Sequence, residues 1–444
     1  MAIPRRTALL VVAIAATLLG ALILAIPALV KVDRYRPRII SYLQEKLGKQ
    51  VEIGRLALTL FPISIHVDDF GVKNPPIFPP GYIVKIAHAD AALDVRALLH
   101  RQVVITSLVL DSPVIHLSSD PDGPWNFENP EARASQATFP LGMIYKVEIK
   151  RGQLLASNLL HSDAQGPIFF EAHDIFCDLQ DVNLIGIISS SSSASDGRGS
   201  LQTSRLSFGV VDAKNLNSKF ELANRQVSFT DVKAEVYGGT AAGTLFFDMS
   251  GKNATFKTNA RFSGISVAHL LASFQNVRAK MTGKMEGDLA LAGQIAHTPR
   301  PLAGIHGAGH VTVRDGELPG LQLNANLMKL VRFNDLGPAK ENPASFNMIS
   351  TDLELANLRI TSKKIDIDGY GVDIDGSGNL NVDGSDELEY QGVAQITTPQ
   401  GFFTRTFARF AGATVKDGKL SFPFHIGGTI ASPLFSKVER VGSR

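Results

Sequence analysis

Beyond residue 50, apolar and polar residues alternate along most of the chain. The pattern opens with two runs of three apolar residues spaced two apart: Leu56, Leu58 and Leu60, then Ile63, Ile65 and Val67. It returns in later segments at Leu206/Phe208/Val210, Val311/Val313, Leu353/Leu355, Ile365/Ile367, Val372/Ile374 and Leu380/Val382. Side chains two positions apart share one face of a strand, and Asp-Gly pairs, which are strong hairpin-turn signals, punctuate these segments. The pattern predicts a mainly β fold built on an elongated antiparallel sheet with one apolar face.

The run from Ala8 to Val30 breaks this pattern, because its 23 residues include no charged side chain. As a helix the run would extend about 34 Å, enough to cross a hydrocarbon core about 30 Å thick. A cleavable signal peptide normally has a hydrophobic region of about 7–15 residues, so a retained transmembrane helix over 8–30 is the expectation. Basic residues flank the run on both sides, but long soluble domains translocate largely regardless of such charges. We therefore expect residues 1–7 in the cytoplasm and the chain beyond the helix to be exported.

Residues 31–50 predict a short, membrane-proximal amphipathic helix. Four apolar residues share one helical face and a glycine follows at the expected C-terminal cap: Ile39, Ile40, Leu43, Leu47 and Gly48. Two interpretations of this helix stay open. It caps the following sheet with its apolar face, or it lies on the bilayer surface. In the second case three arginines would lie near anionic lipid head groups: Arg34, Arg36 and Arg38.

The remaining segments divide the exported part into modules. Apolar stripes at helical spacing predict helices near 267–281 and 321–331 within the strand pattern. The Ser-rich stretch 189–204 is low in complexity and predicts a flexible linker. We therefore expect an N-terminal β module over 51–188 and a C-terminal β module over 205–444.

Composition excludes several classes of function. The 444 residues carry a net charge of +2, whereas obligate nucleic-acid binders concentrate excess Lys and Arg. Cys177 is the one cysteine, so neither an intrachain disulfide nor a cysteine-based metal cluster can form. The sequence has no common nucleotide-binding, hydrolase or metalloprotease motif, and its 11 histidines are scattered. We therefore expect no enzyme and assign no catalytic, cofactor-binding or metal-binding residue.

Four stretches of the chain resemble the AsmA family of Gram-negative envelope proteins. The first runs from Tyr35 to Pro62, directly after the apolar run. The second, Ile105 to Phe127, closes with an Asp-Gly-x-x-Asn motif at 122–126. The third and fourth, Leu302 to Leu321 and Phe422 to Pro433, look like the family's C-terminal core and last strand. Each motif is degenerate, so the resemblance depends on their order.

The resemblance implies an inner-membrane anchor and a periplasmic sheet curled into a groove (β-taco-like), related to the bridge-like lipid-transfer proteins. Such a groove would bind or conduct phospholipids and support outer-membrane biogenesis and envelope lipid homeostasis. Its apolar lining would include the residues of the first two strands: Leu56, Leu58, Leu60, Ile63, Ile65 and Val67. A scaffold or regulator of outer-membrane protein assembly that carries no lipid is the alternative, because a closed β-sandwich shows the same alternation as a groove. Both interpretations allow an outer-membrane or periplasmic protein partner.

Overall fold

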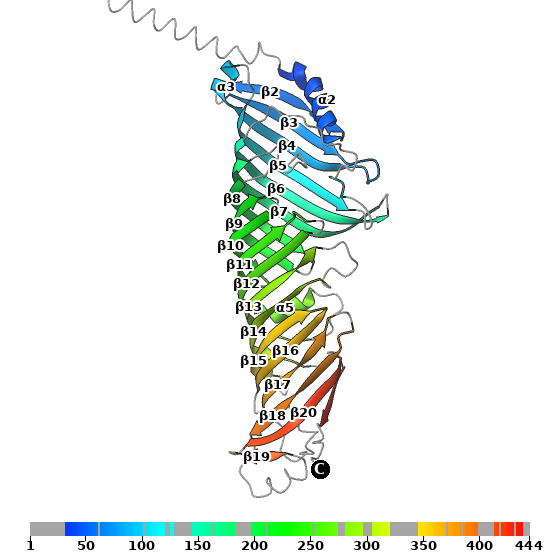
Figure 1. Cartoon of the computed structure of the whole chain (residues 1–444), viewed down its shortest axis with the longest axis vertical. Coiled ribbons are helices and arrows are strands. Elements are labelled where there is room, and N and C mark those ends of the chain that lie inside the picture. The colour runs from blue at the N-terminus through cyan, green and yellow to red at the C-terminus, as the bar shows by residue number, and fades with distance from the viewer. Residues whose placement is uncertain are drawn as a thin grey trace, which may run out of the picture. The chain divides into compact units, whose positions relative to one another are not determined.

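Strands make up most of the described chain, as the alternating pattern predicts. The computed structural model describes residues 32–60, 63–100, 104–119, 125–127, 144–161, 164–182, 197–209, 211–224, 226–251, 254–273, 280–295, 304–319, 345–369, 372–382, 385–397, 413–416, 419–429 and 432–437. These residues contain 21 strands, hydrogen-bonded as a largely antiparallel sheet, and a few short helices (Figure 1). The chain divides into two compact units, Met1–Gly209 with Asn217–Arg225 and Val210–Leu216 with Gln226–Arg444.

The N-terminal unit contains the first eight strands. They are β1 (Val51–Glu52), β2 (Arg55–Leu60), β3 (Ile63–Lys73), β4 (Tyr82–Leu93), β5 (Ile105–Ser119), β6 (Ile144–His161), β7 (Ala164–Val182) and β8 (Gly197–Phe208). Strand β3 pairs with both β1 and β2, and β4 to β8 then follow in chain order. Strands β5 and β6 pair in parallel, which departs from the predicted antiparallel order. A parallel pair needs a long connection, and the chain between Ser119 and Ile144 supplies it.

Short helices precede and interrupt these strands. A 3₁₀ helix, η1 (Val32–Tyr35), leads directly into α2 (Arg36–Leu47), and α3 (Val95–Leu99) follows β4. Gly48 ends α2 in the left-handed conformation, with a φ of 62°, at the cap position that the sequence predicts. The predicted transmembrane helix, 8–30, lies outside the described residues. Among the residues that are described, no helix combines the length and apolar character needed to cross a membrane.

Residues with left-handed backbone interrupt the pairing of strands β5, β6 and β7 in turn. Ser112, Arg151 and Asp174 lie mid-strand with φ of 52°, 53° and 49°, in the left-handed region that residues other than glycine seldom occupy. The pairing of β5 with β6 is interrupted at this level, directly after Asp111. The Arg151 guanidinium spans the interruption, with Nη2 2.5 Å from both carboxylate oxygens of Asp111 and Nε 3.3 Å from the Ser112 hydroxyl. The register of β6 against β7 shifts between Ile149 and Gly152, and a β-bulge of this kind bends a strand and strengthens its twist.

Asn126 fixes the loop after β5 to two other segments. Its side chain is completely buried, and its backbone N–H donates to the Ser118 carbonyl at 2.8 Å. Its Nδ2 donates to the His116 carbonyl at 2.8 Å and to Asn74 Oδ1 at 3.0 Å. Asn74 in turn donates to the Pro79 carbonyl at 2.9 Å, inside the Pro-rich turn between β3 and β4. Asn126 is the last residue of the Asp-Gly-x-x-Asn motif, so the motif ends on a residue that joins two loops.

The C-terminal unit is a series of antiparallel hairpins. Its strands are β10 (Gln226–Val236), β11 (Gly239–Asp248), β12 (Ala254–Ser266), β13 (Lys284–Ile295), β14 (His306–Glu317), β15 (Ser345–Ala356), β16 (Arg359–Gly369), β17 (Val372–Asn381), β18 (Leu388–Thr397), β19 (Thr414–Lys416), β20 (Lys419–Thr429) and β21 (Ser432–Lys437). Residues of β9 (Val211–Ala223) are divided between the two units. Strands β10 to β18 pair in chain order, and β20 pairs with β18, β19 and β21.

Two expectations about the chain between residues 189 and 281 need correction. Among the described residues, the helix predicted over 267–281 is limited to α5 (Val267–Ala272), and residues 274–279 lie outside the described residues. Ser273 ends α5 by donating from both its N–H and its hydroxyl to the Leu270 carbonyl. The linker predicted over 189–204 is wrong from Gly197 onward, because β8 begins there. Leu201 of β8 faces Cys177 of β7, so strand pairing overrides the local Ser-rich composition. Residues 189–196 and the predicted helix 321–331 lie outside the described residues.

The most closely packed core of the C-terminal unit surrounds Phe422 on β20. Phe422 is 2% exposed, and Leu420 and Ile396 are each 1% exposed. Phe422 lies directly opposite Ala394 of β18, which is fully buried. Every second residue of β20 from Leu420 to Ile426 enters this core. The segment that resembles the family's last strand therefore begins in β20, where alternate side chains are buried in this core.

Glycines and leucines interlock on one face of β13 and β14. Leu289 faces Gly309, and Leu291 faces Gly307. A Cβ atom added at Gly309 would lie 2.1 Å from the carbonyl oxygen of Asp288 and 2.7 Å from the Leu289 side chain. A Cβ atom added at Gly307 would lie 2.9 Å from the Leu291 side chain. The leucines thus occupy space that larger residues on β14 would need.

Replacing Gly309 by alanine should destabilise the C-terminal unit by about 1–3 kcal/mol, because the new methyl group overpacks a site closed by backbone. Urea unfolding of the purified chain, followed by circular dichroism, measures the change. The control is Ala308→Ser at the exposed neighbouring position, which should stay within about 0.5 kcal/mol of the parent. Equal stability of Gly309→Ala and the parent would contradict the close approach of β13 and β14.

Candidate functional site

The six residues predicted to line a groove lie on one face of the hairpin formed by β2 and β3. They form three directly opposed pairs: Leu56 with Val67, Leu58 with Ile65, and Leu60 with Ile63. Directly opposed residues of antiparallel strands project to the same side of the sheet. The structure therefore brings the side chains of Leu56, Leu58, Ile63, Ile65 and Val67 onto one face, and the Leu60 side chain lies outside the described part of the chain.

The same face continues across the following strands. Val67 lies opposite Ala89 of β4, which lies opposite Leu110 of β5. Leu110 pairs with Ile149 of β6, and Ile149 pairs with Cys177 of β7. Burial raises the pKa of the Cys177 thiol to about 11, so the thiol stays protonated at neutral pH. One row of uncharged, mainly aliphatic side chains thus crosses β3 to β7, and we call this side of the sheet the apolar face.

Helix α2 covers one end of the apolar face. Its apolar side chains, from Ile39 to Leu47, pack on a buried cluster that includes Val51 and Leu56. Leu56 is 5% exposed as a result, and other groove candidates contact the same cluster. Leu58 is half-buried and is not part of this cluster. The packing agrees with the interpretation of residues 31–50 as a helix that caps the sheet. It leaves the side chain of Leu58 more accessible than that of Leu56.

The three arginines proposed to approach a membrane have different surroundings. Arg36 is half-buried, donates from Nη1 to the Gly54 carbonyl, and places Nε 3.7 Å from the Asp33 carboxylate. It therefore joins the start of α2 to the strands beneath it. Arg34 and Arg38 are exposed. Tyr35, between them in the sequence, is exposed as well. Of the three arginines, Arg34 and Arg38 are therefore the ones whose side chains are free to contact a membrane or a partner protein.

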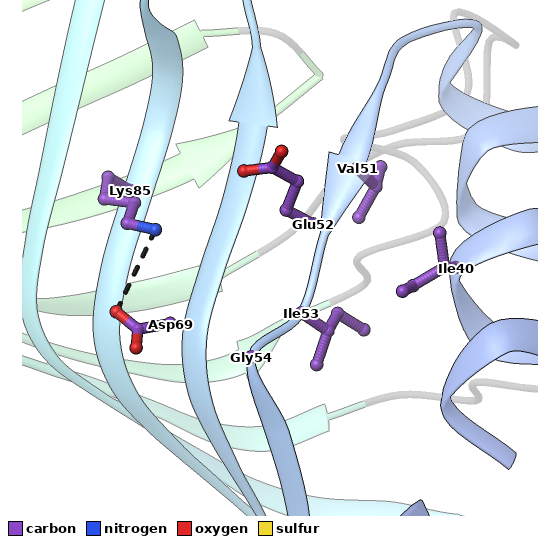
Figure 2. A pocket seen from close by; sticks show the side chains of 7 residues that line it. All are labelled: Ile40, Val51, Glu52, Ile53, Gly54, Asp69 and Lys85. Carbon is purple, nitrogen blue, oxygen red and sulfur yellow. Dashed lines mark ion pairs between the residues drawn. The ribbon is translucent and has the colours of Figure 1, made fainter. Parts of the chain in front are cut away.

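A shallow hollow of about 520 Å³ lies between α2 and strands β1, β3 and β4 (Figure 2). Ile40 of α2 and Ile53 point toward each other across it. The strand side of the hollow is charged, with Lys85 Nζ 3.9 Å from the Asp69 carboxylate. The packing of α2 already covers the apolar wall of this hollow, because Val51 and Ile53 are 3% and 8% exposed.

The opposite face of β3 and β4 is polar, and four titratable side chains meet on it. His66 faces Asp90, with Nδ1 2.7 Å from Oδ1, and Asp68 faces His88, with Oδ1 2.8 Å from Nδ1. The hydrogen bond to Asp90 raises the pKa of His66, and the hydrogen bond from His88 lowers the pKa of Asp68. Sequence spacing alone does not bring these residues together. The signal that could have found them is a His-x-Asp triplet repeated on two adjacent strands, at 66–68 and 88–90.

The C-terminal unit has an apolar face of its own. Strands β11 and β14 alternate between exposed residues and half-buried residues such as Leu245 and Val311. Leu245 lies opposite Phe229 of β10, and Leu289 of β13 lies opposite Ala260 of β12. A second layer would bury these side chains as completely as Phe422, yet they are half-buried. The face therefore stays partly accessible on the described residues of β10 to β14.

The N-terminal part of the chain matches a known family. Residues 4–139 match the family model described as the AsmA family, and the matched range includes β1 to β5 and both N-terminal stretches that resemble the family. The two C-terminal stretches lie outside the match, so their resemblance stays a prediction. No curated protein is detectably similar to the chain. Residues 4–139 of this chain therefore form an AsmA family domain.

Proposed function

We propose that this chain binds or conducts phospholipids along the apolar faces of its sheet, and thereby supports outer-membrane biogenesis and envelope lipid homeostasis. In this proposal residues 8–30 anchor the chain in the inner membrane as a single-pass helix, and the bulk of the chain lies in the periplasm. The lipid-binding region is a sheet curled into a groove. The AsmA family domain supports the envelope location.

The observation that carries the proposal is the partial exposure of an apolar face opposite a polar one. In the N-terminal unit, Leu58 and Ile65 are half-buried on the side opposite the exposed or charged residues of the same hairpin. In the C-terminal unit, Leu245 and Leu289 are half-buried in the same way. Exposed apolar surface costs free energy in water, so a contiguous strip of it implies an apolar ligand or partner.

The energetics suit a lipid. Burying an acyl chain gains about 0.8 kcal/mol per CH₂, so a lipid with about 30 methylenes gains roughly 25 kcal/mol as an upper bound. Successive strands offer similar apolar rows, so a lipid that leaves one row meets an equivalent one a strand spacing of about 4.8 Å away. Movement along the face then needs no catalytic residue.

The second candidate function is a scaffold or regulator of outer-membrane protein assembly that carries no lipid. Two observations favour the scaffold. The sheet has well-packed cores, and the exposed side chains of Arg34 and Arg38 suit a contact with a protein as well as a contact with a membrane. It predicts that the apolar faces contact protein rather than lipid.

Charge placed on the apolar face tests the proposal. Leu58→Asp in the N-terminal unit and Leu289→Asp in the C-terminal unit should each lower the phospholipid that co-purifies with the full chain, measured by mass spectrometry, by at least about tenfold. The physical reason is that a carboxylate cannot be desolvated against an acyl chain without a large cost.

Each variant has a matched control on the adjacent residue, which projects to the polar face. Thr59→Asp and Ala290→Asp sit at exposed positions next to Leu58 and Leu289 and should leave the co-purified lipid unchanged. Circular dichroism of the four variants serves as the test that each of them is folded. Equal lipid in folded Leu58→Asp, Leu289→Asp and the parent chain, or no lipid in the parent chain, would favour the scaffold.

A further inference from the structure

We propose that His66, Asp68 and His88 bind a divalent transition-metal ion on the polar face of β3 and β4, with Zn²⁺ as the best fit to these ligands. The site is independent of lipid binding, since it lies on the opposite face from the groove candidates. Imidazole nitrogen and carboxylate oxygen form the ligand set of many zinc sites, in which three protein ligands leave a fourth position for water.

The ligands come from two adjacent strands in fixed register. His66 and Asp68 are two residues apart on β3 and share one face, and His88 lies directly opposite Asp68 on β4. One ligand atom from each of the three lies within 4.8 Å of the others. The imidazole rings of His66 and His88 stack with centroids 5.8 Å apart and an interplanar angle of 19°. Because paired strands are rigid, these groups converge without the entropy cost of ordering a loop.

The individual contacts suit an ion shared by the three side chains. His66 Nε2 lies 2.9 Å from Asp68 Oδ1, and His88 Nδ1 lies 2.8 Å from the same oxygen. Ligand atoms around a tetrahedral Zn²⁺ at about 2.0–2.1 Å are separated by roughly 3.3 Å, so each contact needs to open by only a few tenths of an ångström. Side-chain rotation is sufficient for that change, because the His88 side chain is 58% exposed.

Asp90 supplies the outer support that zinc-bound histidines usually have. Its Oδ1 lies 2.7 Å from His66 Nδ1, so this nitrogen donates to Asp90 when Nε2 faces the ion. A carboxylate behind a metal-bound histidine fixes the ring and increases its basicity. Asp90 is therefore a positioning residue.

The surrounding charges also fit. Asp111 of β5 lies opposite His88, but its carboxylate is held by Arg151. Arg55 of β2 lies opposite Asp68 and is exposed, so its long side chain can move away from a bound cation. Asp68 and Asp90 together carry two negative charges, which a divalent ion neutralises while both histidines are neutral.

Titration of the full chain, purified in detergent without a polyhistidine tag, tests the site. The probes are Zn²⁺, followed by calorimetry, and Co²⁺, whose visible absorption reports imidazole coordination. We expect one equivalent of tight binding in the parent chain. His66→Gln and His88→Gln should each weaken Zn²⁺ binding by at least about tenfold, and Asp90→Asn should weaken it by about 10–100-fold while leaving the stoichiometry unchanged.

The matched control is His310→Gln. His310 also bridges two strands to a carboxylate, with Nδ1 2.8 Å from Asp352 Oδ1, but no second histidine is part of that contact. We expect this variant to bind Zn²⁺ like the parent. Absence of stoichiometric binding in the parent would overturn the proposal. So would equal affinity in the folded His66→Gln/His88→Gln double variant and the parent, which would show that the four side chains form only an ion-pair network.

Discussion

Replacing Phe422 by alanine should destabilise the C-terminal unit by about 3–5 kcal/mol. The ring is 2% exposed and lies over the fully buried Ala394, among neighbours that are themselves almost inaccessible to water. Removing it loses the transfer free energy of the aromatic group and leaves a cavity that the paired strands cannot close. The free energy of unfolding, from urea titration of the purified chain by circular dichroism, gives the size of the loss.

The control for this variant lies on the neighbouring strand. Leu434 of β21 is 66% exposed, so Leu434→Ala should change the free energy of unfolding by less than about 0.5 kcal/mol. A loss below about 1 kcal/mol in Phe422→Ala would mean that the β18–β20 core relaxes around the missing ring. That result would contradict the close packing described for this strand.

Replacing Asn126 by aspartate should cost on the order of 3 kcal/mol in the N-terminal unit. The change removes both side-chain donors, so the His116 carbonyl and Asn74 Oδ1 lose their bonds, and a carboxylate is buried facing two acceptors. Trp125, the chain's single tryptophan, is the adjacent residue and stacks on Phe127 at 5.8 Å. Its fluorescence during urea unfolding therefore reports on this loop directly.

An Asn→Asp change at an exposed turn provides the comparison. Asn357 is exposed with a φ of 52°, a conformation that aspartate also tolerates, so Asn357→Asp should leave stability almost unchanged. If Asn126→Asp unfolded at the same urea concentration as this control, the bonds from Asn126 would contribute nothing to the joint between the two loops.

The period of the apolar residues predicted the fold class because it reports on burial directly. The alternation at Leu56 to Val67 placed six positions on one face, and the strand register agrees for the five whose side chains the structure describes. The period contains no information on strand direction, which is why the parallel pairing of β5 with β6 was not foreseen. It also overlooks strands with polar composition, such as the Ser-rich start of β8, whose pairing depends on a neighbouring strand.

The candidate sites were harder to predict than the fold, because they depend on register. His66 and Asp90 are 24 residues apart in sequence, and only the pairing of β3 with β4 brings them within 2.7 Å. The difference between half-buried Arg36 and exposed Arg34 and Arg38 has the same origin, since Arg36 donates to the Gly54 carbonyl in the connection between β1 and β2. Spacing along the chain predicts which residues of one strand share a face. It does not predict which residue lies opposite on the neighbouring strand, because that depends on how the two strands pair.

The left-handed residues Ser112, Arg151 and Asp174 also protect this sheet against mispairing. Strands with a two-residue apolar repeat can slide past each other by two positions and still bury the same side chains, so the repeat alone tolerates shifted neighbours. A slide of β6 along β5 would move left-handed Arg151 away from left-handed Ser112 and separate the Arg151 guanidinium from Asp111. Each of these residues therefore helps to fix the register of a strand whose two-residue repeat alone does not fix it. A chain of many similar hairpins can in this way assemble with every strand beside its own partner.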